Sequence, residues 1–78
     1  EGGAEIQFRN PHDYPLPASA DFQVLEKIVA ERGEIALGVY RAEADERGRH
    51  LQLNPPRNQY LDLRDGDQLL VLCLGAER

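Results

Sequence analysis

The stretch Gln68-Leu69-Leu70-Val71-Leu72-Cys73-Leu74 decides the fold of this 78-residue chain. It is nearly unbroken Leu and Val, and no Gly or Pro interrupts it. A short apolar run of this kind is typical of a strand that is covered on both faces. We therefore predict a central strand over 68–74, entered through a tight turn at Asp65-Gly66-Asp67, where glycine accepts positive φ freely.

Three other segments alternate side chains with the period of two that strands show. In 4–9, Ile6 and Phe8 lie on one side and charged or polar residues on the other. In 34–41, Ile35, Leu37 and Val39 form one face of the predicted strand. Ala36, Gly38 and Tyr40 form the other, which is small enough to accept a closely packed neighbour. In the third, we expect Leu51 and Leu53 to face inward before Asn54-Pro55-Pro56 ends the strand, because proline donates no ladder hydrogen bond.

One amphipathic helix is expected over about residues 20–32. Its apolar residues recur at steps of three and four and form one stripe: Phe22, Val24, Leu25, Ile28 and Val29. Ser19 or Asp21 is placed to cap its start, and Gly33 to end it in the left-handed conformation. Before it, three prolines in 10–18 favour an extended loop.

The order strand, helix, strand, strand, strand predicts an α+β domain, with a small, mostly antiparallel sheet and one amphipathic helix packed on a face. At 78 residues the chain is a single domain over 1–78. The side chains expected to form its core are Ile35, Leu37, Val39, Leu51, Leu53 and residues 69–74. A core this small gains from a partner surface.

Composition excludes several classes of function. Nine basic and fourteen acidic residues give a net charge of −5, so the chain offers no cationic stripe for DNA or RNA. No apolar run is long enough to cross a bilayer, so we expect no membrane insertion of this segment. The single Cys73 forms no internal disulfide. The chain contains no methionine, which leads us to expect that it was excised from a longer protein.

No motif for nucleotide binding or hydrolysis occurs, and we predict no catalytic residue and no enzyme activity. The alternative is a small enzyme that uses Cys73 with His12 or His50. Because Cys73 lies inside an apolar strand, we expect a buried, inert thiol instead. Labelling of the native thiol at neutral pH separates the two readings.

Two groups of residues resemble metal ligands. His12 and Asp13, with Glu5 or Glu34, offer imidazole and carboxylate ligands, but at none of the tight local spacings of structural zinc sites. Asp62, Asp65 and Asp67 offer carboxylates without the spacing of a calcium loop, and a hydrated turn explains them better. The same holds for Glu43, Asp45 and Glu46, which alternate with arginines on a solvated surface. We predict no metal site and no cofactor.

The segment 22–73 resembles the C-terminal lobe of the domains that regulate potassium conductance, called TrkA-C-like or RCK_C, and is most similar to the Castor/Pollux ion-channel family. The order and spacing of its motifs carry the resemblance. They are the helix with Phe22, Leu25, Ile28 and Ala30; then Glu34-Ile35-Ala36-Leu37-Gly38 and Tyr40-Arg41; then Leu53-Asn54-Pro55; and then Asp65-Gly66-Asp67-Gln68-Leu69-Leu70-Val71-Leu72. Val39, Pro56 and the polar loop 42–50 depart from the family pattern and leave the subfamily open.

The resemblance implies a cytosolic regulatory or gating domain of a potassium or other cation channel or transporter, at the cytoplasmic side of the cell membrane. It implies a homodimer or gating ring, and a Rossmann-like domain and a membrane channel portion in the same chain. A nucleotide or cation ligand is compatible with it, but no residue here carries one over. The alternative is an adaptor or binding module of an unrelated system.

Overall fold

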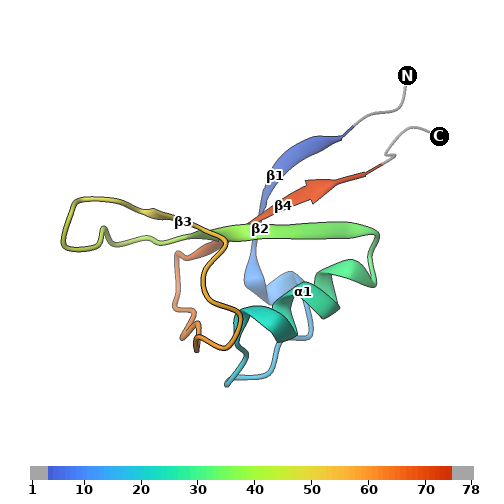
Figure 1. Ribbon diagram of the computed structural model, residues 1–78, viewed down its shortest axis with the longest axis horizontal. Coiled ribbons are helices and arrows are strands. Elements are labelled where there is room, and N and C mark those ends of the chain that lie inside the picture. The colour runs from blue at the N-terminus through green and yellow to red at the C-terminus, as the bar shows by residue number, and fades with distance from the viewer. Residues whose placement is uncertain (1–3, 75–78) are drawn as a thin grey trace.

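The computed structural model describes residues 4–74. It contains four strands, one α-helix and one short 3₁₀ helix, with these bounds: β1 Glu5–Arg9, η1 Pro11–Asp13, α1 Phe22–Ala30, β2 Glu34–Tyr40, β3 Leu51–Leu53 and β4 Gln68–Cys73. The strands form one sheet in the order β1-β4-β2-β3, and every neighbouring pair is antiparallel. The predicted α+β class is confirmed, and β4 is an inner strand as its apolar sequence indicates (Figure 1).

The helix α1 is shorter at both ends than the predicted 20–32. Asp21 is its cap: the residue has extended backbone, and its carboxylate accepts a 2.9 Å hydrogen bond from the Val24 amide. Gly33 follows at φ 77°, in the left-handed region that ends a helix. The 10–18 loop differs from the expected extended path, because Asn10 caps the single turn of η1 through a 2.9 Å bond from the His12 amide.

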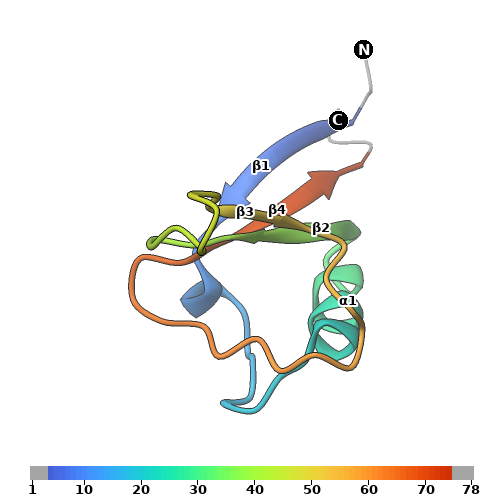
Figure 2. The ribbon, with the colours of Figure 1, turned by 60° about the vertical axis from the view of Figure 1, so that its left-hand side comes forward.

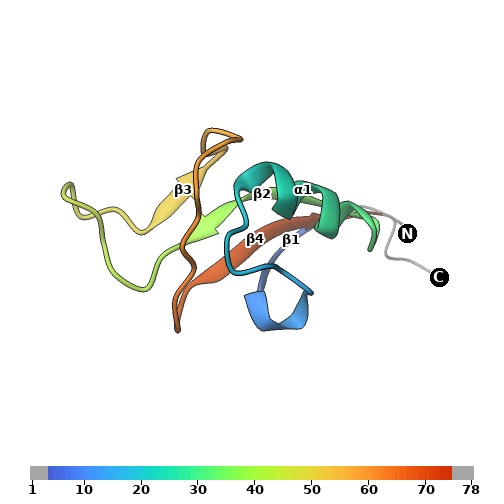
Figure 3. The ribbon, with the colours of Figure 1, turned by 90° about the horizontal axis from the view of Figure 1, so that it is seen from below.

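The helix, the loop before it and the segment 54–67 all lie on one side of the sheet, whereas the loop 41–50 extends beyond the end of β2 and β3 (Figure 1). Figures 1 and 2 show α1 and the loops that precede and follow it beneath the strands. Seen from below in Figure 3, α1 lies along β2, and the segment 54–67 runs across the same side. The core fills the space between these layers and consists of Tyr14, Phe22, Leu25, Val29, Ala36, Val39, Leu61, Leu69 and Val71.

Part of the predicted core is wrong. Ile35, Leu51 and Leu53 are 46%, 41% and 58% exposed, because they point away from the helix, and Leu74 is also exposed. Leu37, Leu72 and Cys73 are only partly buried. A bulge between Ala36 and Gly38 shifts the alternation of β2. Val39 is buried in the core, as predicted, and Ala36 from the opposite alternating set is buried beside it on the helix side.

Two local features hold the sheet together at the β2–β3 end. Gly38 lies where β3 comes closest to β2: a Cβ on this residue would be 2.1 Å from the carbonyl oxygen of Gln52. Asp67, in the turn before β4, is buried and accepts bonds from the Ala42 amide at 2.9 Å and from the Arg41 guanidinium at 3.0 Å. This pair ties the start of β4 to the end of β2.

Candidate functional site

The sheet face opposite α1 is apolar. Side chains of directly paired residues point to the same face, so the register assigns each position. Across the sheet, Leu72 pairs with both Ile6 and Ile35. The side chains of these three residues point to the face away from α1. The other members follow from the same register, and together we call this set the open face: Ile6, Phe8, Ile35, Gly38, Tyr40, Leu51, Leu53, Gln68, Leu70 and Leu72.

The open face is both exposed and uncharged. Its most accessible members are 41% to 64% exposed: Ile6, Phe8, Ile35, Leu51 and Leu53. Within strands β1 to β4, no acidic or basic side chain occupies a register position on this face. Two members of the set, Gly38 and Leu70, are buried. A continuous exposed apolar patch of this kind marks an interaction surface.

Aromatic rings lie across the centre of the open face. Phe8 meets Tyr40 edge to face, with ring centroids 5.5 Å apart and planes at 73°. Tyr40 stacks in turn on His50, at 5.4 Å and 10°. The His50 Nδ1 donates to the Arg41 carbonyl oxygen, 2.8 Å away, which orients the imidazole. Aromatic side chains that are held in place in this way are favoured anchors at protein interfaces.

A polar cluster lies at the other end of the sheet, on the helix side, around Glu34. Its carboxylate accepts bonds from the Tyr14 hydroxyl at 2.7 Å and from Arg9 at 3.2 Å. Burial, and then the hydrogen bond to Glu34, raise the pKa of Tyr14 to about 12. The Arg9 guanidinium also donates to the Cys73 sulfur at 3.2 Å, and this bond raises the pKa of Arg9. Each polar group of the cluster has a partner, so the cluster links β1, β2 and β4.

The candidate catalytic residues lie in three different places. Cys73 contacts Arg9 and Glu34, and its thiol is partly rather than fully buried. His50 stacks on Tyr40 at the open face. His12 is exposed on the loop after β1, 3.9 Å from an Asp65 oxygen. Among residues 4–74, the hydrogen-bond partners of the thiol are Arg9 and Glu34, and neither histidine is one of them.

The predicted carboxylate groups are also separated. Asp62 pairs with Arg64, Asp67 with Arg41, and Asp65 is exposed. Asp45 accepts hydrogen bonds from the backbone amides of Arg49 and Arg47. These bonds hold the pKa of Asp45 below its usual value, and the bond from Arg49 contributes most. Among residues 4–74, no three His, Cys, Asp or Glu side chains come together as a metal-binding group.

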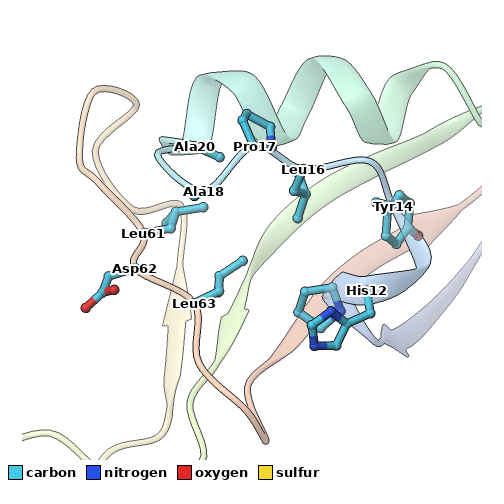
Figure 4. Close-up of a pocket in the computed structure, with 10 residues that line it drawn as sticks. His12, Tyr14, Leu16, Pro17, Ala18, Ala20, Leu61, Asp62 and Leu63 are labelled. Atoms are coloured by element: carbon cyan, nitrogen blue, oxygen red, sulfur yellow. The ribbon is translucent and has the colours of Figure 1, made fainter.

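A cavity of about 260 Å³ lies between the 11–20 loop and the 61–63 segment. Figure 4 shows Leu16, Leu61 and Leu63 pointing toward one another, with His12 at one side and the Asp62 carboxylate turned away. Its walls are mainly apolar, and its volume is at the lower limit for a small-molecule site. Two wider depressions, of about 690 and 410 Å³, lie among the charged loops that flank residues 64–67.

The sequence pointed to interaction rather than chemistry, but it did not locate the interaction surface. Alternation along a strand separates two sets of side chains without saying which set the helix covers. The signal that was available is the uncharged character of both alternating sets in 35–40.

No helix among residues 4–74 is long and apolar enough to span a bilayer. Comparisons of the chain with protein-family models, with curated proteins and with solved structures gave no match.

Proposed function

We propose that this chain is a regulatory or gating domain of a potassium or other cation channel or transporter, located at the cytoplasmic side of the membrane. In this proposal it acts by self-association, as a homodimer or within a gating ring, and is linked to a Rossmann-like domain and a channel portion. A ligand that binds one arrangement of the lobes better than another would shift the gating equilibrium by that difference in affinity.

The observation that carries the interaction part of the proposal is the open face. It exposes five large apolar side chains on one side of a four-stranded sheet, and its register positions hold no charge. A single domain normally buries each apolar sheet face against a second layer, and α1 supplies only one. An interaction domain with a partner on the open face satisfies this requirement.

The channel part of the proposal depends on the resemblance to TrkA-C-like domains. Two of the segments that carry this resemblance contact each other. Arg41, from the Tyr40-Arg41 motif, donates to Asp67, from the Asp65-Gly66-Asp67 motif, at 3.0 Å. Gly66 adopts φ 91°, which explains why that motif needs glycine. Residues shared with the family pattern thus perform one structural task, the joining of β2 to β4.

The coding sequence on either side of this chain tests the channel part directly. We expect two or more long apolar segments and, upstream, a strand followed by Gly-x-Gly-x-x-Gly in the same reading frame. A catalytic or DNA-binding neighbour in their place would contradict the channel proposal and favour an adaptor of another system.

A thermal-shift screen tests the ligand part. The chain is heated with calcium, with nicotinamide nucleotides and with adenine nucleotides, one at a time. A ligand that binds the native form raises the melting temperature in proportion to the logarithm of its concentration. If none of these ligands shifts the transition, the native domain does not bind them, and the ligand part of the proposal is wrong for these three classes.

A further inference from the structure

We infer that the open face is the surface on which a second copy of this chain docks, so that two sheets stack face to face about a two-fold axis. The inference rests on the proposed function only for the fact of self-association, and it adds where that association occurs. The occupant is a second copy of the same sheet rather than a helix, a peptide or a membrane.

The shape of the surface favours a sheet as partner. The open face extends over all four strands, from Ile6 in β1 to Leu53 in β3. An amphipathic helix binds in a groove. A peptide that adds a strand binds at a sheet edge, because it pairs through backbone hydrogen bonds. None of the three cavities described above is lined by the apolar side chains of this face. Sheets pack on sheets about 10 Å apart through faces of this kind.

The area is sufficient for a small dimer. Five side chains of the open face are about half exposed. If a large side chain presents on the order of 200 Å², burying them removes roughly 500 Å² per copy and about 1,000 Å² in total. This total reaches the approximate threshold for a specific interface. The roughly 500 Å² that each copy loses is about one tenth of the 5421 Å² that the chain exposes, the usual share for a small protein.

The absence of charge on the open face argues against recognition through ion pairs, whether by a basic partner or by a lipid surface. The chain has a net charge of −5, but the open face carries none of it. Contact through that face leaves the like charges of two copies at the rim, where salt screens their repulsion. In a two-fold dimer, the same residues meet on both sides, so an uncharged apolar surface is complementary to itself. A membrane partner would require basic residues around the patch.

The three isoleucines of the chain give a test that needs no substitution. Ile6 and Ile35 lie on the open face, and Ile28 packs against the core on the helix side. The δ1-methyl groups are labelled, and their NMR signals are followed as the chain is diluted over roughly a hundredfold range. We expect the Ile6 and Ile35 signals to shift together, along a monomer–dimer curve, while the Ile28 signal stays in place.

Sedimentation equilibrium of matched variants provides the second arm. Phe8→Lys puts a charge on the open face, while Tyr60→Lys puts the same charge on a side chain of similar exposure near the N-terminus of α1. Because a two-fold interface contains each position twice, Phe8→Lys should raise the dissociation constant at least tenfold, and Tyr60→Lys by less than about twofold. Raising the salt to about 0.5 M should tighten the wild-type dimer.

The inference has two parts, the docking of a second copy and its location on the open face, and each has an outcome that overturns it. A chain that stays monomeric at the highest concentration overturns the docking of a second copy. The proposed location is wrong if dimerisation shifts the Ile28 signal instead. It is also wrong if Tyr60→Lys weakens the dimer and Phe8→Lys does not. Neither outcome touches the channel assignment, which the neighbouring coding sequence decides separately. Circular dichroism of each variant, compared with that of wild type, establishes that the substituted monomers are folded.

Discussion

Replacement of Asp67 by asparagine should strongly destabilise this domain. One carboxylate oxygen accepts bonds from Arg41 Nη1 and the Arg64 amide, both at 3.0 Å, and the other accepts from the Ala42 amide at 2.9 Å. An asparagine side chain has one acceptor oxygen and one amide group that donates. In either orientation, its amide group therefore faces a buried donor.

The structure gives the size of this effect. Asp67→Asn removes at least one hydrogen bond to a charged acceptor, leaves a donor unpaired, and breaks an ion pair whose carboxylate side chain is only 6% exposed. These losses come to about 3 kcal/mol of unfolding free energy. For a domain of this size, such a loss lowers the melting temperature by on the order of 15 °C.

Urea unfolding, followed by circular dichroism at one low protein concentration, measures the difference. Asp62→Asn is the matched control, because Asp62 is exposed and its φ of 47° suits asparagine equally well. We expect the control to change the free energy by less than about 0.5 kcal/mol. If Asp67→Asn were as mild as Asp62→Asn, the proposed role of Asp67 in joining β2 to β4 would be wrong.

The pH dependence supplies a further check on Asp67. Burial alone raises the pKa of this carboxyl, but the bonds from Ala42, Arg64 and Arg41 outweigh burial and hold the pKa below the usual value. A lowered pKa in the folded state stabilises the fold fully above the unfolded value of about 3.9, and this contribution is lost as pH falls through the folded value. The gap between wild type and Asp67→Asn should therefore stay constant from pH 7 to about 5 and close below about pH 4. A gap that widened in acid would contradict this account.

Three other substitutions test the packing. Gly38→Ala should separate β3 from β2, because its Cβ would meet the Gln52 carbonyl, and amide exchange at Gln52 should rise sharply while α1 keeps its protection. Glu34→Gln should bring the pKa of Tyr14 down from about 12 in an ultraviolet titration, since the negative charge that helps to raise it is gone; an unchanged value would refute the contact. Leu25→Ala, at a fully buried position, should cost about 3 kcal/mol by the same urea assay.

The sequence by itself determined the elements. The run 68–74 predicts an inner strand covered on both faces, because so little of it is polar. β4 is an inner strand, but only its helix side is covered. The stripe Phe22, Leu25 and Val29 predicts α1 and its buried side, since residues three and four apart share one face of a helix. Gly33 and Gly66 mark the positions where the backbone takes positive φ.

Tertiary structure alone decided which strand faces the helix covers, and hence where the candidate interaction surface lies. Alternation places Ile35 and Ala36 on opposite faces, but both are apolar, so the pattern does not say which one is buried. The bulge after Ala36 then changes the phase and turns Val39 inward. Asp67 is buried for a similarly non-local reason: its partner Arg41 is 26 residues away in the chain. One helix is enough to cover only one face of this sheet, and that is why the other face stays open.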